Sequence, residues 1–369
     1  MEVSEFDYHL PPAQIAQHPL DKRDASRLLL LDRTFDRKVG AWEDRAFSEF
    51  PDLLRGDEVI VLNSTRVIPA RLFGHRKGIH AQPLGKGNPA RNGYLETQIE
   101  VLLHRELAPG VWEALVRPGR KLPVGETIVF GNGELEAEVI ARGEFGVRTI
   151  RFTSTGNFAD AVGCLGHIPL PPYIKRHDEP LDRERYQTVF AREGNAVAAP
   201  TAGLHFTDEI LRRVRERGVQ ILELRLDVGL GTFEPVRTER LENHAIHSEA
   251  YEISADVAEA LASARRERRP ILAIGTTVVR ALEDAAEKAA NKPRSSEISV
   301  GKAEATIFLY PGKPFRVVNQ LLTNFHLPRS TLLALVAAFA GRENVLRAYR
   351  HAVESGYRFY SYGDCMLIR

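Results

Sequence analysis

The chain has 369 residues, of which 43% are apolar, and its formal charge at pH 7 is +1. One hydrophobic core usually stops growing below this length, so we expect two or three domains. A nearly neutral chain does not hold nucleic acid by bulk electrostatic attraction, which leaves room only for local basic patches. The two cysteines, Cys164 and Cys365, lie far apart and indicate neither a disulfide framework nor a zinc cluster.

The N-terminal segment is acidic and lacks the apolar stretch of a signal peptide. The longest apolar run, Leu332 to Ala340, is too short to span a bilayer. We therefore expect a cytoplasmic protein with no membrane partner.

The first clear element is a buried strand from Glu58 to Leu62, which ends in the polar loop 63–66. Between about residues 67 and 152, short aliphatic and aromatic segments alternate with turns that contain Gly and Pro. This pattern is typical of an all-β module, and we predict a small barrel. Residues 75–93 are polar, Gly-rich and aperiodic, so we expect an exposed loop there and assign it no function. The predicted strands of the module include Ile99–Leu103, Trp112–Val116 and Thr127–Phe130.

From residue 154 onward, helices alternate with strands. Thr207 can cap a helix that Gly218 ends, and a strand over 219–226 follows. Ser254 opens a second helix, and a strand over 271–274 leads through a glycine into a third.

One strand precedes the β-rich module and several follow it, which favours a sheet to which both ends of the chain contribute. The predicted fold class is α/β: a mixed α/β domain of residues 1–66 and 153–369, with an all-β small barrel of residues 67–152 inserted into it.

Ligands of open α/β sheets bind beyond the carboxyl ends of the strands, so the junctions between strands and helices are the candidate sites. Four junctions are rich in polar residues and glycine. They span residues 63–66, 200–207, 275–280 and 323–330.

The junction Gly275-Thr276-Thr277 would place backbone N–H groups and hydroxyls at a helix N-terminus, where an anion is stabilised. Arg280, one turn further, could add a second contact to the same anion. The alternative is that a threonine serves as an ordinary N-cap.

His205 and His326 each lie in a short loop before a predicted helix, where an imidazole could face a cleft. Histidine is the side chain best suited to proton transfer near neutral pH. The alternative for each is a structural histidine that hydrogen-bonds within its own loop.

Other motifs carry less chemistry. His244, His247 and Glu249 could ligate a metal, but the spacing is not that of H-E-x-x-H, a polar loop explains the residues more simply, and we expect no metal. Residues 227–233 resemble half of a dinucleotide fingerprint without its third glycine. The Arg-rich stretches 212–217 and 265–269 are candidate phosphate contacts, although we favour solvated helix faces for both.

Taken in order along the chain, these segments resemble the S-adenosylmethionine:tRNA ribosyltransferase-isomerase family of the queuosine pathway. Asp227 stands where the family typically has His, so we assign that position no role of a histidine. The matching segments are Phe6–Pro12, Ile15–Pro19, Leu62–Arg71, Gly166–Ile174, Tyr186–Phe190, Pro200–Thr207, Gly229–Pro235, His244–Glu249, Gly275–Thr277, Leu322–Thr331 and Tyr357–Asp364.

The resemblance implies a cytoplasmic transferase and isomerase that uses S-adenosylmethionine as a substrate, with no tightly bound cofactor. The implied acceptor is the aminomethyl group of 7-aminomethyl-7-deazaguanine at the wobble position of tRNA, and the products are epoxyqueuosine-tRNA, adenine and methionine. We expect the enzyme to be a monomer.

Within the matching segments we expect His205 and His326 to transfer protons. Thr276, Thr277 and Arg280 are expected to bind the methionine carboxylate or a tRNA phosphate. The remaining expected substrate contacts are Asn63, Arg66, Thr201, Gly203, Asn324, Arg329 and Asp364, the last of which could instead form an Asx-turn.

Two other classes of protein remain open. A Rossmann-type methyltransferase would also use S-adenosylmethionine, but its early strand should end in a Gly-rich loop instead of Asn-Ser-Thr-Arg. A non-catalytic RNA-binding module could use the β insert, whose aromatic residues are only scattered.

Overall fold

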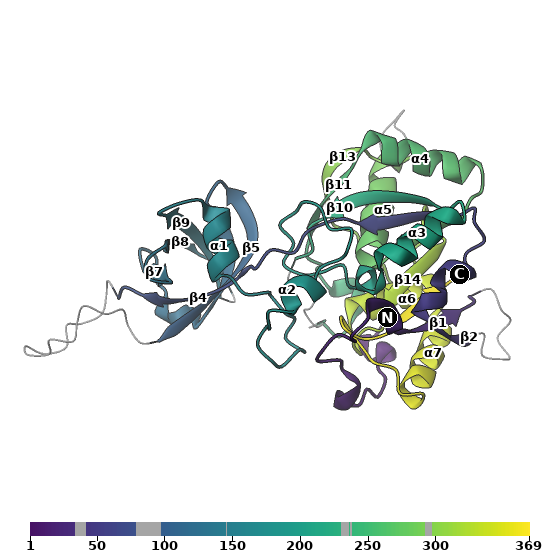
Figure 1. Cartoon of the computed structure of the whole chain (residues 1–369), viewed down its shortest axis with the longest axis horizontal. Coiled ribbons are helices and arrows are strands. Elements are labelled where there is room, and N and C mark those ends of the chain that lie inside the picture. The colour runs from purple at the N-terminus through teal and green to yellow at the C-terminus, as the bar shows by residue number, and fades with distance from the viewer. Residues whose placement is uncertain (34–41, 79–96, 145, 230–235, 237, 292–296) are drawn as a thin grey trace, which may run out of the picture. The chain divides into compact units, whose positions relative to one another are not determined.

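The computed structural model describes residues 1–33, 42–78, 97–144, 146–229, 236, 238–291 and 297–369 (Figure 1). The chain forms two compact units. The larger unit comprises Met1–Arg66, Pro171–His177 and Glu184–Arg369, and the smaller one comprises Val67–Leu170 and Asp178–Arg183.

The described residues of the larger unit form a nine-stranded sheet with the order β13-β11-β10-β3-β12-β14-β15-β1-β2. Its strands are β1 (Arg27–Leu31), β2 (Trp42–Ala46), β3 (Val59–Asn63), β10 (Gln220–Leu226), β11 (Glu249–Ile253), β12 (Ile271–Ile274), β13 (Gly301–Ala305), β14 (Gln320–Asn324) and β15 (Cys365–Ile368).

Four neighbouring strands at the centre, β10, β3, β12 and β14, are parallel to one another. Their carboxyl ends therefore lie at one edge of the sheet. The outer pairs β11–β10, β13–β11, β14–β15 and β1–β2 are antiparallel, and β1 runs parallel to β15.

Successive residues of the central strands contribute to two separate cores, because side chains alternate between the faces of a sheet. In β3, Val59 and Val61 belong to one core, whereas Ile60 and Leu62 belong to the other. The first core includes residues of α4 (Ala255–Arg266), α5 (Thr276–Ala290), α6 (Thr331–Ala340) and α7 (Arg342–Glu354). The second core includes residues of η4 (Phe47–Leu53) and α3 (Asp208–Glu216).

The smaller unit is built around a closed antiparallel barrel with the strand order β4-β5-β6-β9-β8-β7. Helix α1 (Phe158–Leu165) contacts β9 and β4. The Arg183 side chain donates hydrogen bonds to the carbonyls of Gly163 and Gly166, which fastens segment 178–183 to the end of α1. The barrel strands are β4 (Arg71–Arg76), β5 (Gln98–Ala108), β6 (Val111–Arg117), β7 (Thr127–Phe130), β8 (Leu135–Arg142) and β9 (Val147–Ser154).

The predicted fold class, a mixed α/β fold with a small barrel, is confirmed. The strand over 271–274 has the predicted bounds, and the side chains of Thr207 and Ser254 cap α3 and α4 as predicted. No helix in the described ranges has the length and apolarity needed to cross a membrane.

Two boundaries differ from the sequence prediction. Residue 152 lies inside β9, and the smaller unit continues to Leu170 because α1 packs on the barrel. The loop predicted over 75–93 begins later, since His75 and Arg76 pair with β7 as the last residues of β4. The rest of that loop, from residue 79, lies outside the described residues.

Candidate active site

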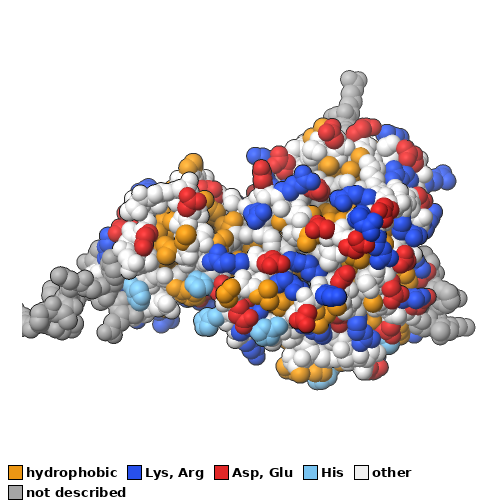
Figure 2. Space-filling model, viewed as in Figure 1, with side chains coloured by type: hydrophobic (Ala, Val, Ile, Leu, Met, Phe, Trp, Pro, Cys, Tyr) orange, Lys and Arg blue, Asp and Glu red, His pale blue; other side chains and the backbone are white. Residues whose placement is uncertain are grey.

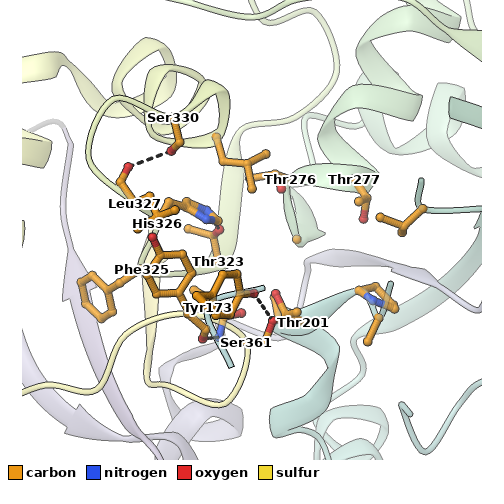
Figure 3. A pocket seen from close by; sticks show the side chains of 18 of the residues that line it. Tyr173, Thr201, Thr276, Thr277, Thr323, Phe325, His326, Leu327, Ser330 and Ser361 are labelled. Carbon is orange, nitrogen blue, oxygen red and sulfur yellow. Dashed lines mark hydrogen bonds between the residues drawn. The ribbon is translucent and has the colours of Figure 1, made fainter. Parts of the chain in front are cut away.

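A cavity lies in the larger unit at the carboxyl ends of β12 and β14 (Figure 3). It encloses about 800 Å³ of space, part of it open to solvent, which is within the size range of small-molecule sites. We call it the main cavity. Its lining comprises Tyr173, residues 199–202, Val228, residues 275–277, residues 323–328, Ser330, Leu332, Tyr360 and Ser361.

Two tyrosines form an aromatic wall of the main cavity. The ring centroids of Tyr173 and Tyr360 are 4.2 Å apart with an interplanar angle of 32°. The Tyr173 hydroxyl is hydrogen-bonded to Ser361 (Figure 3), and burial raises the pKa of Tyr173 well above its ordinary value, so the phenol stays neutral. Tyr360 has a φ of 76°, a left-handed conformation that a residue with a side chain rarely adopts and that recurs at functional sites.

The N-terminus of α5 forms a polar wall of the main cavity. Gly275 precedes the helix with a φ of 94°, a conformation that favours glycine, and its lack of a side chain leaves the first turn uncapped. The alternative that a threonine caps this helix is therefore wrong. The Thr277 hydroxyl is buried and has no hydrogen-bond partner among the described residues. Figure 3 shows Thr277 on the far side of Thr276 from His326.

Asn324, at the end of β14, is held with its amide in one orientation. Its Nδ2 donates to the carbonyl of Tyr360 at 2.9 Å and lies 3.4 Å from the carbonyl of Asp364. Because Nδ2 faces carbonyl oxygens, the other amide atom, Oδ1, must be the acceptor. This buried oxygen has no donor in the described part of the chain, so it is available to a ligand N–H or O–H group.

His326 also lines the main cavity. Its Nε2 is 2.8 Å from the Thr323 hydroxyl, and its backbone carbonyl accepts a hydrogen bond from Tyr8. Burial lowers the pKa of His326 to about 3, so the imidazole is neutral at pH 7.

His205 lies outside the lining of the main cavity and faces a second, smaller pocket. We call this the arginine pocket; it is lined by Lys22, Arg23, Ser26, Arg185, His205 and Ser361, among others. The two ring nitrogens of His205 are 2.6 Å from the Ser26 hydroxyl and 3.3 Å from Asn324 Nδ2. Burial, followed by the charges of Arg23 and Arg358, lowers the pKa of His205 to about 3.

A family model described as "Queuosine biosynthesis protein" matches residues 3–368. The chain belongs to this family. It is 54% identical over 370 residues to a protein of Solibacter usitatus and 47% identical over 369 residues to one of Moorella thermoacetica, with 100% of both chains covered in each case. Both relatives are named S-adenosylmethionine:tRNA ribosyltransferase-isomerase.

A solved structure, that of the S-adenosylmethionine tRNA ribosyltransferase from Thermotoga maritima, is 35% identical to the chain. The match covers 99% of this queuosine biosynthesis family member and 100% of the solved chain, with a TM-score of 0.52.

In this family member, the structure brings five of the predicted site residues together around the main cavity. They are Thr201, Thr276, Thr277, Asn324 and His326. Gly203 lies next to them for a packing reason, since a Cβ atom there would meet Phe190 at 2.7 Å and Thr188 at 2.8 Å.

Four other predicted contacts have structural partners outside the main cavity. Asn63 bonds the backbone N–H and carbonyl of Leu226, which joins β3 to β10. Arg66 donates to the carbonyl of Arg192. The side chain of Arg329 is exposed and pairs with Asp7. Asp364 accepts the backbone N–H groups of Arg27 and Arg358, both of which precede it in the chain, so these bonds are not those of the Asx-turn considered as its alternative role.

Arg280 lies in a separate small pocket, where it forms a buried ion pair with Glu249. It also donates hydrogen bonds to the carbonyls of His247 and Ala305, each at 3.0 Å. The ion pair engages the carboxylate of Glu249, the acidic residue of the possible metal motif His244, His247 and Glu249. Of residues 227–233, those from 230 onward lie outside the described residues.

Sequence reasoning missed Tyr173 and Tyr360 as members of the site. Both belong to segments that carry the family resemblance, 166–174 and 357–364, and this was the only signal available. Neither lies in a helix or strand, so no periodicity could place their rings against each other.

Proposed function

We propose that the chain is an S-adenosylmethionine:tRNA ribosyltransferase-isomerase. It transfers and isomerises the ribosyl group of S-adenosylmethionine onto 7-aminomethyl-7-deazaguanine at the tRNA wobble position, and releases adenine and methionine. Relatives that match over the full length at 44–54% identity carry the name of this activity. The proposal includes a monomer that acts in the cytoplasm, with S-adenosylmethionine as substrate and no tightly bound cofactor.

The observation that carries the proposal is the combination of two opposite kinds of wall in the main cavity. An aromatic pair, Tyr173 and Tyr360, offers a surface on which a purine can stack. The uncapped N-terminus of α5, with Thr276 and Thr277, offers N–H groups and hydroxyls to a carboxylate. S-adenosylmethionine has an adenine at one end and an amino-acid carboxylate at the other, so it matches both walls.

The proposed chemistry starts at the sulfonium group. Its positive charge acidifies the adjacent C5′ protons, so a modest base can begin the rearrangement, and adenine leaves more readily when it is protonated. Methionine departs as a neutral thioether. A site that limits the access of water also protects the reactive intermediate.

We assign proton transfer to His326, because it is the histidine that lines the main cavity. Its lowered pKa keeps the imidazole in the proton-accepting form but makes it a weak base. The reaction therefore depends on the sulfonium, which lowers the pKa of the C5′ protons that this weak base removes.

We keep His205 in the proposal as a group that acts through Asn324, which it contacts at 3.3 Å. Since Asn324 Nδ2 is the donor, His205 Nε2 is the acceptor and Nδ1–H donates to Ser26. This arrangement fixes the Asn324 amide, whose Oδ1 then faces no donor of the described protein.

The proposal is tested with two preparations of S-adenosylmethionine, one labelled in the ribose and one in the methyl group. Incubation with tRNA that carries 7-aminomethyl-7-deazaguanine should move only the ribose label into tRNA. Transfer of the methyl label, with formation of S-adenosylhomocysteine, would identify a methyltransferase and overturn the proposal.

A further inference from the structure

Three arginines around the arginine pocket form no close ion pair in the described structure, although Glu184 and Asp364 act on Arg23 and Arg358 electrostatically from a greater distance. Arg23 and Arg185 line this pocket, and Arg358 lies close enough to influence His205 electrostatically. Among the described residues, none of the three forms an ion pair within 4.0 Å. All three side chains are only partly exposed.

Their hydrogen bonds go to backbone carbonyls instead, which do not neutralise the charge. Arg23 donates to the carbonyls of Glu184 and Leu204, and Arg185 donates to those of Leu20 and Asp21. Two guanidinium nitrogens, Nε of Arg185 and Nη1 of Arg358, are buried and lack an acceptor within the described ranges. Unpaired buried charge is costly, so such a cluster favours an anionic ligand.

The cluster differs from several arginines elsewhere on the larger unit that pair with acidic side chains. Arg212 pairs with Glu209, Arg213 with Asp52, and Arg266 with Glu259. On the face shown in Figure 2, basic and acidic side chains are interspersed. The lining of the arginine pocket, by contrast, contains the cations Lys22, Arg23 and Arg185 and no Asp or Glu among the described residues.

The pocket also has a position that suits a substrate group. Ser361 lines both the arginine pocket and the main cavity, and His205 contacts Asn324 of the main cavity. An anion bound among Lys22, Arg23 and Arg185 would thus lie in a pocket that shares Ser361 with the main cavity.

We propose that the arginine pocket binds a backbone phosphodiester of the tRNA substrate, next to the modified nucleotide. This inference rests on the proposed function. A second source of the same anionic chemistry is the carboxylate of S-adenosylmethionine, but the α5 N-terminus already provides for one carboxylate. Planar guanidinium groups suit the oxygen pair of a phosphodiester.

The test measures the dissociation constants of tRNA and of S-adenosylmethionine separately, at several salt concentrations, with the whole chain. Lys22 is exposed, and its side chain makes no hydrogen bond in the described structure, so Lys22→Gln should fold normally. Loss of one contact to single-stranded RNA should lower the slope of log Kd against log salt by about 0.7 and weaken tRNA binding about fourfold at 0.15 M salt. The affinity for S-adenosylmethionine should stay that of the wild type.

Arg215→Gln is the matched control, because Arg215 is an exposed arginine of α3 that lines none of the pockets described and its loss changes the net charge by the same amount. It should keep the wild-type salt slope. Equal slopes for the two variants would overturn the proposal, and so would a weaker affinity for S-adenosylmethionine with unchanged tRNA binding, which would assign the pocket to the carboxylate.

A second pair of variants separates charge from structure. Arg185→Lys keeps the charge but not the two carbonyl contacts, whereas Arg185→Gln loses both. The proposal predicts a salt slope close to wild type for the first variant and a reduced slope for the second. The same slope of log Kd against log salt in Arg185→Lys and Arg185→Gln would show that Arg185 has a purely structural role. These binding measurements need no turnover, so they remain decisive even if the wild-type protein forms no epoxyqueuosine.

Discussion

The Thr277 hydroxyl allows the proposed carboxylate site to be tested with one nearly isosteric substitution, Thr277→Val. The hydroxyl is buried at the first turn of α5 without a hydrogen-bond partner among the described residues. An unsatisfied buried hydroxyl costs about 1–3 kcal/mol, so the valine should stabilise the ligand-free protein. For a unit of this size the melting temperature should rise by about 2–4 °C per kcal/mol.

The same substitution should weaken the binding of S-adenosylmethionine. A hydrogen bond to a charged group contributes about 1.5–3 kcal/mol, which corresponds to a Kd roughly 10- to 150-fold higher. Stability and affinity should therefore change in opposite directions. Thermal melting of the ligand-free protein and calorimetric titration with S-adenosylmethionine measure the two effects.

Thr188→Val is the matched control. The Thr188 hydroxyl is also buried without a partner in the described structure, but Thr188 does not line the main cavity. It should raise the melting temperature and leave the affinity unchanged. Unchanged affinity in Thr277→Val as well would refute the assignment of the α5 N-terminus to the substrate carboxylate.

Three further predictions concern other parts of the larger unit. The pKa of His326 is lowered from 6.5 to about 3, so between these pH values the folded state binds fewer protons than the unfolded state, and the stability from this group is complete above pH 6.5 and lost as the pH falls toward 3. Melting temperatures of His326→Gln should therefore depend less on pH between 6.5 and 5 than those of the wild type, and the turnover of this variant should fall. The same acid sensitivity in both proteins would contradict the lowered pKa. Glu249→Gln should lower the unfolding free energy by about 3–5 kcal/mol, because it leaves Arg280 as an uncompensated buried charge. Denaturant titration should show part of this loss restored in the double variant Glu249→Gln/Arg280→Met. Wild-type stability of the single variant would show that the pair is not buried. Tyr173→Leu should raise the Kd of S-adenosylmethionine about 2- to 12-fold, because it removes the stacking surface, worth about 0.5–1.5 kcal/mol, while an unchanged Kd would place the adenine elsewhere.

The sequence was most informative where local rules and the tertiary structure agree. The strand over 271–274 is a short apolar run that a glycine ends, and Thr207 and Ser254 are capping residues, so their elements could be placed within a residue. The loops 275–277 and 323–330 were predicted as candidate sites because they lie at junctions between strands and helices, and the structure brings them together because β12 and β14 are parallel neighbours.

Contacts between distant loops could not be predicted in the same way. Tyr173 and Tyr360 stack although no periodic element contains them, and Arg23, Arg185 and Arg358 gather from three separate segments. Two Arg-rich stretches, 212–217 and 265–269, stood out in the sequence. Arginines of both form ion pairs on the protein surface, which agrees with their interpretation as solvated helix faces. Asn63 and Asp364 were expected to contact the substrate because their segments carry the family resemblance, but their side chains satisfy backbone groups.

The proposed ribosyl transfer is tested most directly by incubating the purified protein with S-adenosylmethionine and with tRNA that carries 7-aminomethyl-7-deazaguanine, and by quantifying adenine and the modified nucleoside. We expect one adenine to be released for each epoxyqueuosine formed. A folded protein that binds S-adenosylmethionine but yields neither product, or yields S-adenosylhomocysteine, would contradict it.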